Sequence, residues 1–285
     1  MLRGLFIAAF FFTMTPLLIS VQWVLDRFGL PGWGAIASNY YRVLCKIMRI
    51  RVRVVGTPVR DRAVLFVSNH VSWSDILVIG SLAPVAFVAK REVRDWPLVG
   101  ITAQLQRTVF VDRTRRQQTG DAISEICKRL ESGVPVVLFA EGTSSDGNRV
   151  LPFRSALIGA VRDACRMSSD KRLVIQPMAI CYTGAQGIPM GRQHMPAVAW
   201  YGDLDFMPHI KAFIQRAPFD AVVSFGDPIT TDGEGDRKEM ARMLEGTVRR
   251  VMASALRGRS IPAASEPSAG HSIPVEKPLP VLKSQ

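Results

Sequence analysis

A histidine and an aspartate five residues apart, His70 and Asp75, are the side chains in this sequence best suited to acid–base chemistry. An imidazole gains and loses its proton near neutral pH, and a neighbouring carboxylate fixes its tautomer and stabilises the imidazolium. Such a pair can take the proton from an alcohol. Asp75 also has a purely structural alternative, because the run from Ser72 to Asp75 has the form of a capping box that opens a helix. The spacing alone leaves both roles open.

Short apolar runs alternate with helical patterns along the chain, which is typical of an α/β fold. Strands are predicted at residues 50–55, 63–67, 85–89, 108–111, 134–140, 173–180 and 221–225, and helices at 75–81, 96–105, 117–131, 155–167 and 237–257. We therefore expect a mainly parallel mixed sheet flanked by helices, with the active groups at strand ends.

A second polar loop follows the predicted strand at 134–140 and contains Glu141, Gly142 and Thr143. In a parallel sheet this loop opens on the same edge as the loop that carries His70. Two other histidines, His194 and His209, lie in segments that we predict to be loops, and we assign them no role.

The N-terminal part of the chain has the composition of a membrane anchor. Residues 4–25 carry no charge and are long enough to cross a bilayer, whereas Pro16 equally allows a kinked segment within one leaflet. Residues 40–53 interleave apolar and basic side chains, as a helix on anionic headgroups does. We predict a membrane anchor with a basic interfacial helix at 1–49, a catalytic domain at 50–259 and a disordered proline-rich tail at 260–285.

The net charge of +12 and the pI of about 10.1 point to an anionic partner, either nucleic acid or a membrane surface. The apolar N-terminus and the mean hydropathy of +0.15 favour the membrane. The sequence has no recognised nucleic-acid-binding module, no metal-ligand spacing and no dinucleotide fingerprint. We therefore predict no nucleic-acid partner, no metal and no cofactor. Basic residues after the apolar stretch predict that the remaining chain lies on the cytoplasmic side of the membrane.

Four sequence blocks make the chain resemble the glycerolipid acyltransferase family typified by 1-acyl-sn-glycerol-3-phosphate acyltransferase. The blocks are N-H-x4-D at 69–75, a basic block from Lys90 to Arg113, F-A-E-G-T at 139–143 and an apolar block that ends in Pro177. They occur in the family's order and at similar distances, and the resemblance covers roughly residues 50–230.

This resemblance implies a membrane-bound enzyme that moves a fatty acyl group from a thioester, on acyl carrier protein or coenzyme A, to a lysolipid hydroxyl. The thioester is a substrate, so no cofactor is implied, and we expect direct transfer without a covalent acyl-enzyme. His70 would be the general base and Asp75 its orienting partner. The residues expected to bind the acceptor are Lys90, Arg113, Glu141, Gly142, Thr143 and Arg154.

One departure from the family pattern concerns the acceptor. Ser144 stands where the family has an arginine after E-G-T. That arginine implies a bidentate clamp on the acceptor phosphate, and a serine hydroxyl cannot imitate its charge or geometry. Arg154 or Lys90 could still serve a phosphate.

Segments at 90–97, 141–147, 189–192 and 199–203 are similar to the lyso-ornithine lipid acyltransferases of bacteria. Their acceptor hydroxyl lies on a 3-hydroxyacyl chain amide-linked to ornithine, a lipid without phosphorus. We expect this acceptor, and the resemblance implies a location in a bacterial inner membrane. Two alternatives remain open: a 1-acyl-sn-glycerol-3-phosphate acyltransferase that makes phosphatidic acid, and a non-catalytic protein that binds anionic membranes.

Overall fold

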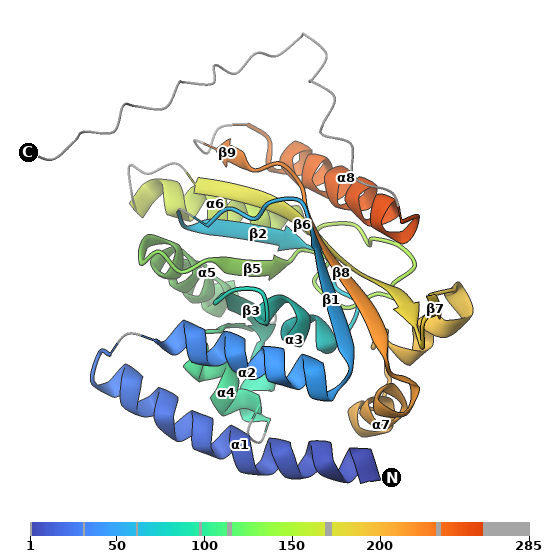
Figure 1. Ribbon diagram of the computed structural model, residues 1–285. Helices are drawn as coiled ribbons and strands as arrows, with labels where there is room; N and C mark the ends of the chain where they lie inside the picture. Colours follow the sequence, from blue (N-terminus) through green and yellow to red (C-terminus); the bar gives the residue numbers. More distant parts are fainter. Residues whose placement is uncertain are drawn as a thin grey trace, which may run out of the picture.

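The computed structural model describes residues 2–30, 32–60, 62–96, 99–112, 116–168, 173–231 and 235–258. Arg113 and the predicted tail at 260–285 lie outside the described residues. Within them, helices cover both faces of a central sheet (Figure 1).

The described residues form a nine-stranded sheet whose main path runs β1-β8-β6-β2-β5-β3-β4, while β7 and β9 pair with β6. Neighbouring strands are parallel except that β6 runs antiparallel to β7, β8 and β9. This confirms the predicted mainly parallel mixed sheet. The strands are β1 (Ile50–Val55), β2 (Val64–Ser68), β3 (Ala86–Lys90), β4 (Val109–Val111), β5 (Val136–Phe139), β6 (Leu173–Ala185), β7 (Ile188–Pro189), β8 (Phe219–Phe225) and β9 (Ile229–Thr231).

Helices α5, α6 and α8 cover one face of the sheet, and α2, α3 and α7 contribute to the core on the other face (Figure 1). The helices are α1 (Leu2–Arg27), α2 (Trp33–Ile47), α3 (Ser74–Gly80), α4 (Val99–Leu105), α5 (Arg116–Glu131), α6 (Ser155–Ser168), α7 (Phe206–Arg216) and α8 (Arg237–Leu256), with short 3-10 helices η1 (Arg91–Asp95) and η2 (Arg192–Ala197).

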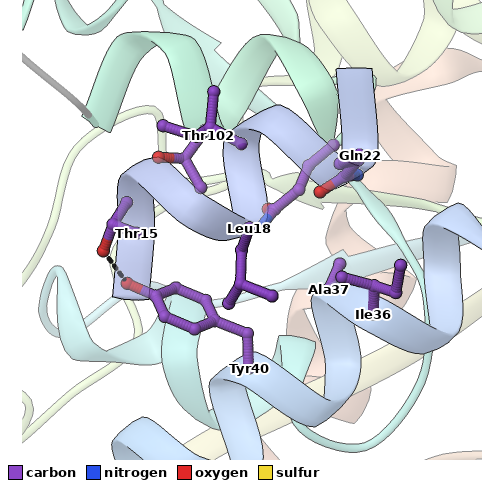
Figure 2. A pocket seen from close by; sticks show the side chains of 9 residues that line it. Thr15, Leu18, Gln22, Ile36, Ala37, Tyr40 and Thr102 are labelled. Carbon is purple, nitrogen blue, oxygen red and sulfur yellow. Dashed lines mark hydrogen bonds between the residues drawn. The ribbon is translucent and has the colours of Figure 1, made fainter. Parts of the chain in front are cut away.

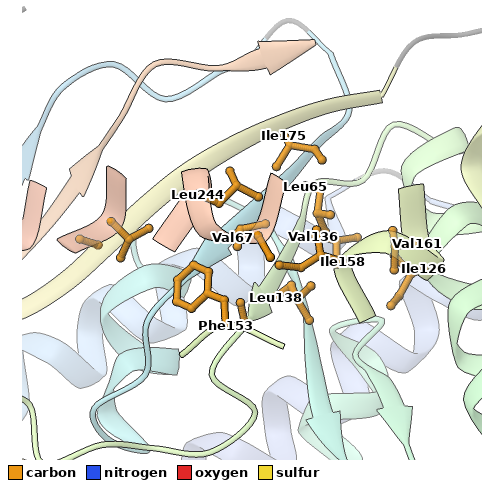
Figure 3. Close-up of a cluster of buried hydrophobic side chains, with 14 of the residues drawn as sticks. Leu65, Val67, Ile126, Val136, Leu138, Phe153, Ile158, Val161, Ile175 and Leu244 are labelled. Carbon is orange, nitrogen blue, oxygen red and sulfur yellow. The ribbon is translucent and has the colours of Figure 1, made fainter. Parts of the chain in front are cut away.

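Side chains that alternate along the central strands supply two separate hydrophobic cores. On β2, Leu65 and Val67 belong to the core under α5, α6 and α8, which Figure 3 shows, whereas Val64 and Phe66 belong to the opposite core. Successive side chains of a strand point to opposite faces, and helices cover both faces of the sheet, so β2 is buried on both sides. The loops that follow such strands are therefore attached to a rigid sheet.

The N-terminal helix α1 lies along α2 and α4 at one edge of the molecule (Figure 1). Its stretch Arg3–Arg27 is, among the described residues, the one helix long and apolar enough to cross a membrane. The Arg3 guanidinium donates to the carbonyl of Met48 (2.9 Å), and the Thr15 and Tyr40 hydroxyls hydrogen-bond beside a small pocket (Figure 2). The residues that line this pocket come from α1, α2, α4 and the turn after α4, and none from the polar loops at the strand ends.

Helix α2 turns its apolar side chains into the protein and its basic side chains outward. Its buried apolar residues, Tyr40, Tyr41, Leu44 and Cys45, pack against α1 and the sheet. Arg42, Lys46 and, just beyond the helix, Arg49 are exposed. A headgroup contact by this segment would therefore involve its basic residues.

Candidate active site

Two polar loops meet at one edge of the sheet. Strands β2 and β5 are parallel neighbours, and their last residues, Ser68 and Phe139, are paired. Beyond the strands, the Ala140 N–H donates to the carbonyl of Ser68 (2.9 Å), and the Ser145 N–H donates to the carbonyl of His70 (2.8 Å). The His70 loop and the Glu141 loop thus lie side by side, as a parallel arrangement of their strands predicts.

His70 and Asp75 form a hydrogen-bonded pair in which Nδ1 lies 2.8 Å from Oδ2. The Asp75 side chain is fully buried, whereas 21% of the His70 side chain is exposed. The same Oδ2 accepts the N–H groups of Val71 (2.7 Å) and Ser72 (3.0 Å), and the imidazole stacks on Phe139 with ring centroids 4.0 Å apart. Because an ionised carboxylate only accepts, we assign the neutral ring's proton to Nδ1, so that Nε2 keeps its lone pair for an incoming hydroxyl.

Only half of the predicted capping box forms. The Asp75 carboxylate accepts the N–H of Ser72, but the Ser72 hydroxyl is buried without a hydrogen-bond partner, and Trp73 occupies the N-cap of α3 without a side-chain bond. Asp75 therefore orders the turn before the helix and holds His70 at the same time. The two roles considered for Asp75 are compatible.

Glu141 joins two loops through both of its carboxylate oxygens. Oε2 accepts the backbone N–H of His70 (3.0 Å), and Oε1 accepts that of Leu151 (2.7 Å). The side chain is buried, which raises the pKa of Glu141 to about 8 although the two N–H donors act in the opposite direction. This geometry gives Glu141 a part in positioning His70, and it leaves the predicted contact with the acceptor as an expectation.

The other residues expected to bind the acceptor surround these loops. Gly142, with a left-handed φ of 75°, and the exposed Thr143 follow Glu141. The exposed Lys90 ends β3, which pairs with β5. Arg154 is also exposed, and its backbone N–H donates to the carbonyl of Ala140 (2.8 Å).

Ser144 ties the Glu141 loop to a segment between η2 and α7. Its hydroxyl donates to the carbonyl of Trp200 (2.5 Å), while the Trp200 N–H donates to the carbonyl of Val71 (3.0 Å). The hydroxyl at the position of the family's arginine is therefore used in a contact within the protein.

His209 was expected in a loop, and this expectation was wrong, because His209 lies in α7 and is buried. Its Nδ1 accepts the indole N–H of Trp73 (3.1 Å), and its Nε2 donates to the carbonyl of Ala199 (3.0 Å). These partners require a neutral ring with its proton on Nε2. Burial accordingly lowers the pKa of His209. His194 lies in η2, which was also not predicted.

Tyr182, which belongs to no sequence motif named above, is a buried neighbour of the pair. Its hydroxyl donates to Oδ1 of Asp75 (3.0 Å) and lies 2.6 Å from the hydroxyl of Ser74. The one sequence signal that could have pointed to Tyr182 is the alternation of side chains along β6, which places Tyr182 on the same face of the sheet as Ile180.

Comparison with known proteins assigns the class. The family described as Acyltransferase matches residues 51–181. The chain is 47% identical over 234 residues to a lyso-ornithine lipid O-acyltransferase of Brucella abortus, covering 82% of this chain and 88% of the relative. It is 41% identical to a lyso-ornithine lipid O-acyltransferase of Rhizobium meliloti, covering 88% and 86%. The chain therefore belongs to the acyltransferase family and is an enzyme that transfers acyl groups.

Two more distant matches carry the other acceptor in their names. A 1-acyl-sn-glycerol-3-phosphate acyltransferase of Neisseria gonorrhoeae is 37% identical over 112 residues, which cover 39% of this chain and 44% of the relative. The crystal structure of the 1-acyl-sn-glycerophosphate acyltransferase PlsC from Thermotoga maritima superposes with a TM-score of 0.61 at 22% identity, covering 90% of this chain and 95% of that chain. The second match supports the fold.

Proposed function

We propose that this enzyme transfers a fatty acyl group from an acyl thioester, carried by acyl carrier protein or coenzyme A, to the hydroxyl of lyso-ornithine lipid. The observation that carries the proposal is the hydrogen bond between His70 and Asp75, which joins a partly exposed imidazole to a fully buried carboxylate. The names of the relatives from Brucella abortus and Rhizobium meliloti support the choice of acceptor.

In the proposed reaction, His70 Nε2 takes the proton of the lysolipid hydroxyl while its oxygen attacks the thioester carbonyl carbon. The resulting tetrahedral intermediate collapses with cleavage of the carbon–sulfur bond. The imidazolium returns its proton to the leaving sulfur, so that the products are an ester and a free thiol. Asp75 stabilises the imidazolium between these two transfers. No residue of the enzyme becomes acylated, and the step needs no cofactor.

The contact of Ser144 with the Trp200 carbonyl supports an acceptor without a phosphate. A phosphate site requires N–H donors or cations directed at the ligand. Here the one hydroxyl at the position of the clamping arginine already donates within the protein. Lys90 and Arg154 remain exposed, and we assign them to the carboxylate of the ornithine headgroup.

We further propose that α1 holds the enzyme on the cytoplasmic face of a bacterial inner membrane. The helix exposes large apolar side chains along its length, whereas in water such groups are usually buried. The exposed set on α1 is Leu5, Phe6, Phe12, Leu17, Val21, Trp23 and Val24. The net charge of +12 adds attraction to anionic lipids.

The acceptor can be tested with the full chain in vesicles of phosphatidylethanolamine and phosphatidylglycerol. An acyl-carrier-protein thioester is supplied with either lyso-ornithine lipid or 1-acyl-sn-glycerol-3-phosphate, and the products are identified by mass spectrometry. We expect ornithine lipid to form at least about tenfold faster, because the residues at the clamp position do not complement a phosphate. Use of 1-acyl-sn-glycerol-3-phosphate alone would contradict the proposed acceptor.

A further inference from the structure

The Asp75 carboxylate has a hydrogen-bond donor on the side away from His70. Oδ2 receives Nδ1 of His70 and the N–H groups of Val71 and Ser72, whereas Oδ1 receives the hydroxyl of Tyr182 at 3.0 Å. The two oxygens therefore have different partners, and the phenol fixes which oxygen faces the imidazole.

The donor and the acceptor of each hydrogen bond around Tyr182 can be assigned from the protons that each group carries. A phenol has one proton, and the carboxylate can only accept it. The hydroxyl of Ser74, 2.6 Å from the Tyr182 oxygen, must then donate to it. Burial raises the pKa of Tyr182 well above its ordinary value, so the phenol keeps this proton. The result is a chain of two hydrogen bonds from Ser74 through Tyr182 to Asp75.

Tyr182 is held rigidly enough to define a position. Its side chain is completely buried and belongs to the core that includes Ile180 and Val78 of α3. The register between β6 and β8 shifts directly after Tyr182, between Tyr182 and Gly184. Such irregularities often occur beside active sites, where they redirect a side chain.

We propose that Tyr182 is a positioning residue for the His70–Asp75 pair. The inference rests on the proposed function, in which His70 is the general base. The phenol holds Oδ1 so that Oδ2 stays directed at Nδ1 of His70, and its hydroxyl dipole offsets part of the carboxylate charge. Without it, the imidazolium would feel a less compensated negative charge and would keep its proton to higher pH. Tyr182 therefore sets both the geometry of the base and the pH above which the base is available.

The test is Tyr182→Phe in the full-length enzyme bound to vesicles, because phenylalanine keeps the ring and removes only the hydroxyl. We expect kcat to fall about tenfold, the loss typical of one hydrogen bond to a charged group, with KM changed less than about twofold. The midpoint of the acidic limb of the pH–rate profile should move upward by roughly half a unit or more. Ser74→Ala, which weakens the same chain at its far end, should move the midpoint in the same direction by less.

Tyr41→Phe is the matched control, since Tyr41 is also a buried phenol but its hydroxyl donates to Gln106, directly after α4, and not to Asp75. It should lower thermal stability and leave the midpoint unchanged. If Tyr182→Phe lowers stability in the same way but keeps the wild-type midpoint and kcat, Tyr182 is only a core residue and the inference is overturned. If Tyr182→Phe does not fold, the midpoint of Ser74→Ala decides in its place.

A second measurement separates this inference from the proposed function. The rate at which diethyl pyrocarbonate modifies His70, located by peptide mass spectrometry, reports the unprotonated ring at each pH without any substrate. Tyr182→Phe should shift this curve upward relative to wild type. An unchanged curve would overturn the inference even if acyl transfer occurs, whereas a shifted curve with no transfer to any lysolipid would overturn only the proposed function.

Discussion

A buried carboxylate is destabilising unless hydrogen-bond donors surround it, and Asp75 has donors from His70, Val71, Ser72 and Tyr182. Two of them are backbone N–H groups of the loop that carries the histidine. The carboxylate is therefore stabilised by the same loop that it orients. This explains why one aspartate five residues after the histidine can serve both the turn and the proposed base.

For Asp75→Asn we expect kcat to fall by at least about a hundredfold, because the neutral amide can neither stabilise an imidazolium nor fix the same tautomer. The measurement is steady-state acyl transfer in vesicles, with circular dichroism as the check that the variant is folded. Asp227→Asn, at the turn after β8, is the control and should keep wild-type kcat. A folded Asp75→Asn enzyme within threefold of wild type would contradict the role of Asp75.

Glu141 predicts a pH dependence of stability. Burial raises its pKa from 4.5 to about 8, so between these values the folded state binds a proton more tightly than the unfolded state. The stabilisation is complete below about pH 4.5 and is lost as the pH rises through 8. Glu141→Gln cannot ionise. The free energy of unfolding of the wild type, measured by urea denaturation, should therefore fall relative to that of Glu141→Gln between pH 5 and pH 9.

The exposed Glu239 on α8 offers a control for that series, and Glu239→Gln should follow the wild type at every pH. A difference between wild type and Glu141→Gln that stays constant across the range would show that the carboxyl of Glu141 titrates normally.

Among the helices and strands, the strands could be predicted from the sequence, whereas helix α7, which contacts the His70 loop through His209, could not. All seven predicted strands form, because apolar runs bounded by turn residues are a local signal. Helix α7 was missed although Ile210, Phe213 and Ile214 have helical spacing, and Pro208 lies in its first turn, where proline is tolerated.

The contacts of the candidate site likewise divide into a local one that the sequence could suggest and long-range ones that it could not. The pairing of His70 with Asp75 is local, so the sequence could suggest it. The contacts of Tyr182 with Asp75 and of His209 with Trp73 join residues 107 and 136 positions apart. They depend on how β6 and α7 pack against the loop, and a single sequence has no pattern that reports such packing.

Helix α7 should influence catalysis through Trp73. This residue lies in the sequence between His70 and Asp75, and its indole N–H donates to His209 of α7. Trp73→Phe keeps aromatic packing against Phe206 and Phe213 but removes the indole donor. We expect a loss of about 1 kcal/mol in the free energy of unfolding and a drop in kcat of about threefold or more. Urea denaturation and vesicle kinetics measure the two effects.

Trp96→Phe removes an indole from the same aromatic cluster, where Trp96 packs on Trp200 and Phe206, and provides the comparison. Equal kcat values for the two variants would mean that packing, and not the bond from Trp73 to His209, matters for the loop.

In the molecule as a whole, direct contacts connect the exposed apolar side of α1 with helix α7 beside the candidate site. Helix α1 is attached along α2 and α4, and Arg3 also donates to the carbonyl of Ile214 in α7 (3.0 Å). A lipid surface bound by α1 would therefore have a defined orientation relative to α7 and the loop that α7 supports. Membrane binding and substrate access are then linked by geometry.

Phe12→Glu should weaken binding to anionic vesicles at least tenfold, because it replaces an exposed aromatic side chain of α1, which would insert into the lipid, with a charge. Sedimentation with vesicles measures the bound fraction. Met243→Glu places the same charge on an exposed apolar position of α8, across the sheet from α1, and should bind like wild type. Equal weakening by both variants would indicate a general effect of charge and not a contact by α1.

The most direct test of the proposed chemistry is the rate of acyl transfer to lyso-ornithine lipid by wild type and by His70→Ala in the same vesicles. General-base catalysis contributes about 10² to 10⁴ in rate, so the variant should lose at least a hundredfold while it remains folded and bound to the vesicles. Transfer by His70→Ala at the wild-type rate would contradict the account.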